Sequence, residues 1–131
     1  MNTFTATLHV GSWSYPLQHF TFGFIQNPGA LGPRPAPVMS GDISIVLLNP
    51  ADEYVRSWGA SEDMFCDGSI VIRKSVEEGI YETIEFTKGQ CAFLQNEYRG
   101  GAHAGTYSST LQIICQEIKV DGIVHYTAPN M

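Results

Sequence analysis

The chain has 131 residues, of which 44% are hydrophobic and 15% are charged, and its formal net charge is −6. This length and apolar content favour a single domain spanning residues 1–131 with its own core. The 7 basic residues are scattered, so no patch can neutralise a run of phosphates and we expect no nucleic-acid partner. No apolar run approaches 18 residues, and Met1–Val10 lacks a charged-then-apolar leader, so we expect neither membrane insertion nor a signal peptide.

The N-terminal part is predicted to form two strands. Polar and apolar residues alternate over Thr3–Val10, which is typical of a strand with one buried face. Gly11–Ser14 is the expected turn, and Tyr15–Phe24 the second strand. The three phenylalanines of that strand share a face and indicate core packing rather than a ligand site.

A proline-rich segment, Gln26–Met39, interrupts the strand pattern. Proline fixes φ and lacks a backbone N–H, so the segment is predicted to be a long extended loop. A loop of about 14 residues is long for a compact domain, and such loops are either functional or floppy surface segments. Both interpretations stay open from the composition alone.

One short helix is predicted at about residues 50–58. Asn49 is a suitable N-cap and Pro50 suits the first helical position. Tyr54 and Trp58 are four residues apart and therefore share a helix face. Because so short a helix is marginal alone, we expect these two side chains to dock it onto the rest of the fold.

Glycines mark the expected ends and turns of the remaining elements. Gly59 is predicted to stop the helix, and Asp67-Gly68 to form a turn. Further turns or loops are expected at Glu77–Gly79, Gly100–Gly105 and Asp121-Gly122.

The other strands complete a mainly β fold. They are expected at Gly41–Leu48, Ser69–Lys74, Ile80–Phe93, Thr106–Val120 and Ile123–Tyr126. In Thr106–Val120 the apolar residues change face midway, which predicts a bulge or a strand covered on different sides along its length. The fold class is therefore a single antiparallel β-barrel or sandwich with one short helix and one long extended loop.

The sequence offers no catalytic or metal-binding pattern. Its 3 cysteines and 4 histidines lie far apart, unlike the close pairs of zinc or redox sites. Neither a GxSxG nor a GxxxxGK[ST] motif occurs. We therefore expect no enzyme, no metal and no cofactor, with Cys91 and Cys115 acting as small core residues.

One alternative is a monomeric barrel that binds a small molecule. Aromatic side chains are the candidates to line its pocket: Tyr54, Trp58, Phe65, Phe86 and Phe93. Such side chains are more often simply core, and the size of the protein in solution separates the two hypotheses.

The order of elements carries a family resemblance over nearly the whole chain. The segments that carry it are Ser40-Gly41-Asp42, Asp67–Val71, Glu82–Phe86, Gly89–Ala92, Cys115–Lys119 and His125. In this order the chain resembles the Hcp (TssD) tube protein of type VI secretion systems, especially the form found in Bacteroidetes, and the tube proteins of related contractile injection systems.

The resemblance implies a structural subunit whose copies form hexameric rings that stack into a hollow tube inside a contractile sheath. It implies sheath, spike and baseplate proteins as partners and effector proteins as cargo in the lumen. It also implies assembly in the cytoplasm and secretion on firing. A hollow lumen needs a polar wall, and two faces are candidates: that of Thr3, Thr5 and Thr7, or that of Thr106, Ser108 and Thr110.

The resemblance also implies that the extended loop reaches a neighbouring subunit or ring. The loop residues assigned to that interface are Pro28, Ala30, Leu31, Pro33, Arg34, Pro35 and Val38.

Overall fold

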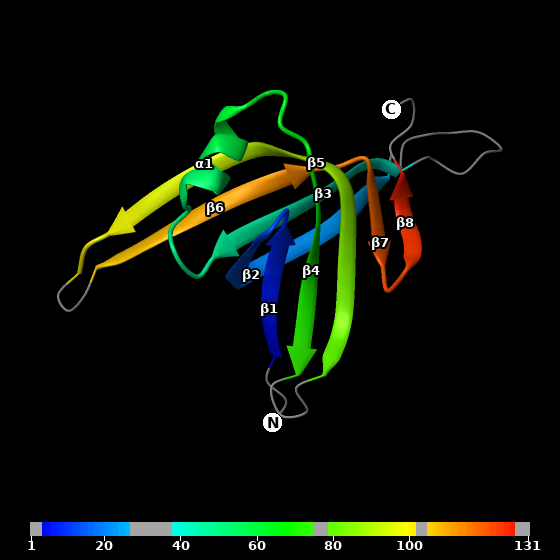
Figure 1. Cartoon of the computed structure of the whole chain (residues 1–131), viewed down its shortest axis with the longest axis horizontal. Coiled ribbons are helices and arrows are strands. Elements are labelled where there is room, and N and C mark those ends of the chain that lie inside the picture. Colours follow the sequence, from blue (N-terminus) through cyan, green and yellow to red (C-terminus); the bar gives the residue numbers. More distant parts are fainter. Residues whose placement is uncertain (1–3, 27–37, 75–78, 102–104, 128–131) are drawn as a thin grey trace.

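The computed structural model describes residues 4–26, 38–74, 79–101 and 105–127, with the backbone alone at 24–26, 38–41 and 124–127 (Figure 1). Eight strands and one helix lie in these residues. In chain order they are β1 (Phe4–Val10), β2 (Trp13–Gln26), β3 (Val38–Leu47), α1 (Glu53–Ala60), β4 (Cys66–Lys74), β5 (Ile80–Arg99), β6 (Thr106–Ile114), β7 (Glu117–Val120) and β8 (Ile123–Thr127).

Six strands close a barrel. Hydrogen-bonded neighbours follow the order β4-β1-β2-β3-β6-β5, and β4 also pairs with β5, which completes the circuit. Every pairing is antiparallel, and the β7–β8 hairpin is attached to the free side of β5. This confirms the predicted mainly β, antiparallel fold with a single helix.

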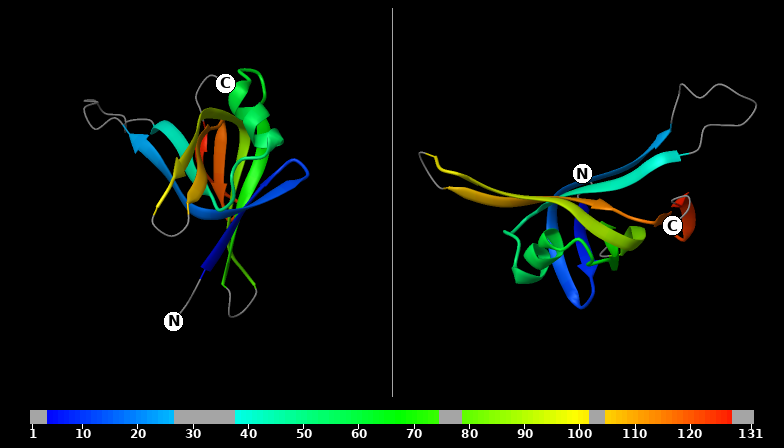
Figure 2. Two further views of the ribbon diagram at one scale, coloured as in Figure 1. Left: turned by 90° about the vertical axis from the view of Figure 1, so that its left-hand side faces the viewer. Right: turned by 90° about the horizontal axis from the view of Figure 1, so that it is seen from above.

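Two long strands belong to the barrel at one end and to a projecting sheet at the other. β2 pairs with β1 up to Pro16 and with β3 from Leu17 onward. β5 pairs with β4 up to Gly89 and with β6 from Gln90 onward. Figure 2 shows the result from above, where β2, β3, β5 and β6 form a long curved layer with α1 and the β1–β2 turn on one side of it.

The interior of the barrel is filled with side chains. Its fully buried members, none more than 1% exposed, are Leu8, Val10, Ile43, Ile45, Leu47, Val55, Trp58, Ile70, Ile84, Phe86, Leu111, Ile113 and Ile118. They come from six strands and α1, so one apolar core holds the described elements together.

Helix α1 begins three residues later than predicted. Its N-cap is Asp52 rather than Asn49, and the Asp52 carboxylate accepts a hydrogen bond of 3.0 Å from the backbone N–H of Val55. Tyr15 of β2 donates its hydroxyl to both oxygens of that carboxylate, at 3.1 and 3.0 Å. This tertiary contact fixes Asp52 as the cap, because it holds the carboxylate beside the first turn of the helix.

Two predicted glycine roles were wrong. Gly59 lies inside the helix, where an added Cβ atom would stand 2.9 Å from the Leu94 side chain, so the glycine allows α1 to approach β5 closely. Gly68 lies within β4 at a register shift rather than in a turn. A Cβ atom there would lie 2.6 Å from the His9 carbonyl oxygen and from the ring of Phe86, so only glycine fits beneath that ring.

The predicted strand Thr106–Val120 is two strands. β6 ends at Ile114 and β7 begins at Glu117, and between them the N–H of Gln116 donates to the carbonyl oxygen of Thr87 at 2.9 Å. The change of apolar face in the sequence marks this break. Asp121 and Gly122 have φ of 51° and 85°, as a type I′ turn between β7 and β8 requires.

Candidate assembly surfaces

Helix α1 is fixed to the barrel by Trp58. The side chain is 0% exposed, and its indole N–H donates to the carbonyl oxygen of Gly89 at 3.2 Å. Gly89 is the last β5 residue paired with β4, so the tryptophan pins the helix at the point where β5 leaves the barrel.

Tyr54, the second predicted docking residue, packs at the edge of the core. Its hydroxyl lies 3.5 Å from the Cys66 sulfur, and its ring centroid is 6.0 Å from that of Trp13, tilted by 40°. The hydrogen bond to Cys66 and burial together raise the pKa of Tyr54 to about 12. The hydroxyl therefore stays protonated at neutral pH, and its role is to pack the helix against β4.

The projecting part of the molecule is a four-stranded sheet, called here the outer sheet: β2 from Leu17, β3, β6, and β5 from Gln90. Among the described residues, this part of β2 pairs only with β3, and this part of β5 only with β6. The outer sheet therefore ends in an unpaired strand edge on each side. Such edges are templates for pairing with another chain.

One face of the outer sheet is mainly polar, and its two exposed apolar side chains are Phe93, the partner of Gln112, and Ile114. Its cross-strand rows include Thr21, Ser44 and Gln112, and Gln112 donates to the Asp42 carboxylate of β3 at 3.0 Å. Of the two candidate polar walls, Thr106, Ser108 and Thr110 lie on this face, because residues alternate along β6 and the opposite face carries the buried Ser109 and Leu111. The opposite face carries the core.

Beyond the barrel, the end of the β5–β6 pair bears two exposed tyrosines. Tyr98 and Tyr107 are cross-strand partners, 68% and 50% exposed. Both lie on the apolar side of the outer sheet, where no barrel strand covers them. Large aromatic side chains of this kind are common at the centres of protein interfaces.

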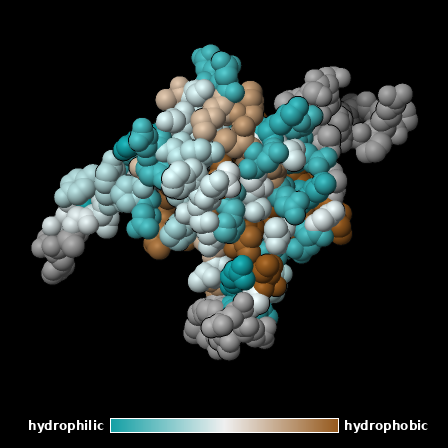
Figure 3. Space-filling model, viewed as in Figure 1, coloured by the Kyte–Doolittle hydropathy of each residue, from teal (hydrophilic) through white to brown (hydrophobic). Residues whose placement is uncertain are grey.

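Other large apolar side chains are also about half exposed or more. They are Phe4, Trp13, Leu48, Phe65, Ile80, Tyr81, Phe93, Ile114 and Ile123. In the view of Figure 3, brown hydrophobic surface gathers over the lower ends of β4 and β5 and near the β7–β8 turn. So much exposed apolar surface on a chain with few charges is typical of a subunit that is covered in an assembly.

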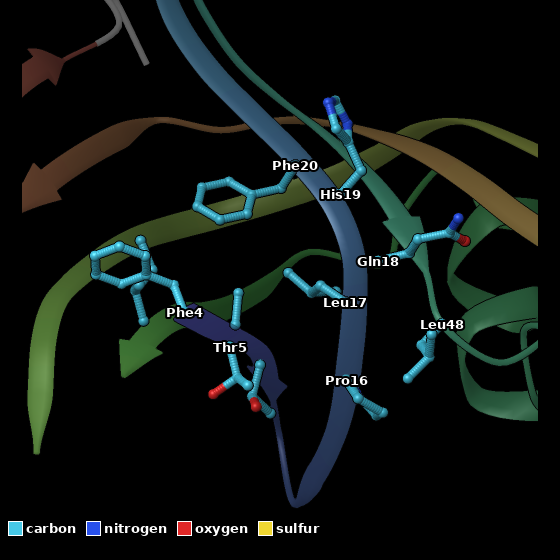
Figure 4. Close-up of a pocket in the computed structure, with 11 residues that line it drawn as sticks. Phe4, Thr5, Pro16, Leu17, Gln18, His19, Phe20 and Leu48 are labelled. Atoms are coloured by element: carbon cyan, nitrogen blue, oxygen red, sulfur yellow. The ribbon is translucent and has the colours of Figure 1, made fainter. Parts of the chain in front are cut away.

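An open groove lies where β1 and β2 separate. Its volume is about 390 Å³, and it is lined from both strands, by Phe4 and Thr5 on one side and by residues Pro16–Phe20 on the other. Figure 4 shows Leu17 and Phe20 projecting from β2 toward the side on which Phe4 lies. The groove exists because β2 stops pairing with β1 at Pro16 and turns to pair with β3.

The aromatic residues proposed to line a ligand pocket do not enclose a common one, and only Tyr54 among them lines the surface pocket beside Trp13. Trp58 and Phe86 expose 0% and 1% of their surface, so both belong to the packed core. Phe65 and Phe93 are 54% and 48% exposed. A barrel filled in this way has no room for the central cavity that a lipocalin-like binder needs.

Most of the predicted loop interface lies outside the described residues. These positions are Pro28, Ala30, Leu31, Pro33, Arg34 and Pro35. Val38 is the first residue of β3, and its backbone pairs with Gln26, so the two ends of the loop segment meet as neighbours in the sheet.

Sequence reasoning missed the two open edges and the tyrosine pair. The edges follow from partner changes within β2 and β5, which no local pattern records. The tyrosines did leave a signal, because Tyr98 and Tyr107 interrupt polar runs on both sides of Gly100–Gly105.

Within the part of the chain that the structure describes, no group of three His, Cys, Asp or Glu side chains is placed to hold a metal ion. No helix found there has the length and apolar character to cross a membrane.

Residues 2–128 match the protein family described as hemolysin coregulated protein Hcp (TssD). The chain belongs to the Hcp (TssD) family. No curated protein matches the sequence.

Solved structures share the fold of this Hcp-family chain. Hcp1 from Flavobacterium johnsoniae superposes with a TM-score of 0.82 at 16% identity, covering 95% of this chain and 99% of that one. Hcp1 from Salmonella typhimurium gives 0.64 at 12% identity, covering 89% and 85%. A chain of the PVC sheath–tube complex, an extracellular contractile injection system, gives 0.63 at 12% identity, covering 90% and 88%.

Proposed function

We propose that this chain is a structural subunit of the tube of a type VI secretion or related contractile injection system. Its copies join into rings of six, and the rings stack into a hollow tube that delivers effector proteins. The function is assembly and needs no catalysis. Membership of the Hcp (TssD) family supports the proposal, and so does the similarity in fold to a chain from a sheath–tube complex.

The two open edges of the outer sheet are the observation that carries this proposal. The free edge of β2 in one copy pairs with the free edge of β5 in the next, so the sheet continues from subunit to subunit. Two different patches meet in this contact, which is the heterologous geometry that closes a ring. Because both edges belong to one curved sheet (Figure 2), each added copy bends the wall in the same direction.

The polar face of the outer sheet forms the wall of the lumen. Hydroxyl and amide groups dominate it, and its Glu97 carboxylate is paired with Arg99 at 2.8 Å. A wall of this kind stays largely hydrated, because its polar groups outnumber the two exposed apolar side chains that share the face, Phe93 and Ile114.

The extended loop joins one ring to the next. The residues that flank it, Gln26 and Val38, pair with each other where β2 ends and β3 begins, and this end of the outer sheet is where a contact with the next ring would start. The sheath, spike and baseplate proteins are the further partners. The tube assembles in the cytoplasm and is secreted when the sheath contracts.

Negative-stain electron microscopy with light scattering on the same purified sample tests the proposal. We expect rings of six, alone or stacked into tubes with a central hole. A particle of about 14 kDa at every concentration would contradict self-assembly by this chain and would favour the monomeric binding barrel instead.

A further inference from the structure

A small pocket lies between the first turn of α1 and the β1–β2 turn. Its lining residues are Trp13, Asp52, Glu53, Tyr54 and Ser57, and its volume is about 390 Å³. Trp13 is 51% exposed and leans on Tyr54, with 6.0 Å between their ring centroids. We call this site the Trp13 pocket. It combines an exposed aromatic wall with an acidic rim.

The acidic rim has no cationic partner in the described residues. Asp52 is held in place by Tyr15 and by the N–H of Val55, and Glu53 follows it directly. Neither carboxylate forms an ion pair with any residue that the structure places, and Arg56, one turn along α1, does not line the pocket. The pocket therefore presents two negative charges beside a tryptophan ring.

These groups fit a planar cation flanked by proline. A guanidinium group stacks on tryptophan and binds carboxylates through two parallel hydrogen bonds. Aromatic-lined grooves also receive extended proline-rich segments, whose fixed backbone loses little entropy on binding.

The chain contains a segment with this chemistry. Residues 27–37, outside the described parts, read NPGALGPRPAP. Arg34 is the only charged residue among them, and it stands between Pro33 and Pro35. The charge of the segment is thus complementary to that of the Trp13 pocket.

The segment cannot reach the pocket of its own chain. The pocket lies at the first residue of β2, Trp13, whereas the proline-rich segment follows the last residue of the same strand, Gln26. From Leu17 to Gln26 alone, the strand spans about 30 Å, whereas Arg34 lies within about 14 Å of Val38 even when fully extended. Figure 2 agrees, because the outer ends of β2 and β3 lie across the molecule from α1 and the β1–β2 turn.

We propose that the Trp13 pocket receives the Pro33-Arg34-Pro35 segment of a second copy of this chain. The Arg34 guanidinium lies against the Trp13 ring and binds the Asp52 and Glu53 carboxylates. This inference rests on the proposed function and names the surface that receives the loop. The contact joins opposite ends of two copies, so it repeats along an axis without closing, as the stacking of rings requires.

Disulfide trapping in the full-length chain tests the contact. In a Cys66→Ser background, whose other two cysteines are buried, Arg34→Cys is combined with Glu53→Cys and the assembled protein is oxidised. We expect a ladder of covalent multimers on a non-reducing gel. The matched control combines Arg34→Cys with Glu62→Cys, an exposed acidic residue just beyond α1 and outside the pocket, and should give no ladder.

A charge exchange supplies a second test. Glu53→Arg and Arg34→Glu should each shorten the tubes while rings persist, and the double variant should restore their length. Glu62→Arg, which makes the same charge change outside the pocket, should leave tubes unchanged. Full-length tubes from both single variants, or equal cross-linking at positions 53 and 62, would overturn the inference and leave the tube function standing.

Failure of the chain to assemble would contradict the proposed function but would leave the pocket untested by cross-linking. A peptide titration then tests the pocket directly. A peptide of residues 26–39 is added to the full chain while tryptophan fluorescence is followed. Trp58 is buried, so a change reports on Trp13. We expect saturable binding, weakened roughly two- to fivefold by Glu53→Gln. Because Trp13→Ala removes the fluorescent reporter, its binding is measured by calorimetry, where it should be lost. An unchanged signal at millimolar peptide would reject the pocket as the receiving site.

Discussion

Replacement of Trp58 by alanine should remove the anchor between α1 and the barrel. The side chain is 0% exposed and packs with the apolar residues of the core. Truncation of a buried tryptophan costs about 3–5 kcal/mol. The lost bond to the Gly89 carbonyl, 3.2 Å long, adds to this unless water enters the cavity and pairs with that oxygen. We therefore expect the free energy of unfolding to fall by about 4 kcal/mol.

Chemical denaturation followed by circular dichroism measures this loss. The signal does not depend on tryptophan, and a protein concentration below that of assembly keeps subunit contacts from adding stability. The thermal midpoint should fall by roughly 10–20 °C. Trp58→Phe keeps most of the apolar volume but lacks the N–H donor, so it should lose only about 1–3 kcal/mol.

Trp13→Ala is the matched control, since it removes the same side chain from a position 51% exposed. It should cost less than about 1.5 kcal/mol. The reasoning would be refuted if Trp58→Ala lost no more stability than Trp13→Ala.

Four further outcomes are expected. Deletion of Ala30–Pro37 leaves a short connection between the paired ends of β2 and β3, so the subunit should fold and form rings, while microscopy should show fewer stacked tubes; long tubes from this variant would contradict the role of the loop. The double variant Tyr98→Ala/Tyr107→Ala changes exposed side chains only, so its thermal midpoint should move little while ring formation weakens in light scattering, and rings at the wild-type concentration would place the tyrosines outside the contact. Gly59→Ala brings a Cβ atom to 2.9 Å from the Leu94 side chain of β5. Overpacking should outweigh the gain in helix propensity, so the free energy of unfolding should fall by about 1 kcal/mol in chemical denaturation. A stabilised variant would show that Leu94 moves aside at little cost. Burial raises the pKa of the Cys115 thiol from 9.0 to about 12, so as the pH rises the thiol ionises in the unfolded chain before it ionises in the folded one. The free energy of unfolding should therefore hold its full value below about pH 9 and fall as the pH rises toward 12. Cys115→Ala should flatten this fall in a plot of stability against pH, and an unchanged slope would show that Cys115 does not cause it.

Local patterns in the sequence were sufficient for the strands and for the presence of one helix. The strand predicted from alternation and the Asp121-Gly122 turn depend on neighbouring residues alone, and the structure has both, the strand over Phe4–Val10. The start of α1 differs from the prediction because the hydroxyl of Tyr15, 37 positions earlier in the chain, hydrogen-bonds the Asp52 carboxylate and holds it in the N-cap position. Gly59 likewise has a role that only the packing of Leu94 reveals.

The candidate assembly surfaces were less accessible from the sequence. A strand edge is open where no neighbouring strand pairs with it. The open edges of β2 and β5 are therefore recognised only when the pairing of both strands is known over their whole length. The proline-rich loop was visible because proline acts locally. The pocket at Trp13 was not, since it joins the start of β2 to the first turn of α1.

In the proposed tube, the strand count of the outer sheet would set a size limit on cargo. If six copies join edge to edge, the wall holds roughly 24 strands about 4.8 Å apart, which gives a circumference of about 115 Å and a bore of about 37 Å between backbones. A compact domain of about 100 residues has a radius of gyration of about 13 Å and so almost fills that bore. Larger effectors would have to travel unfolded or ride outside the channel.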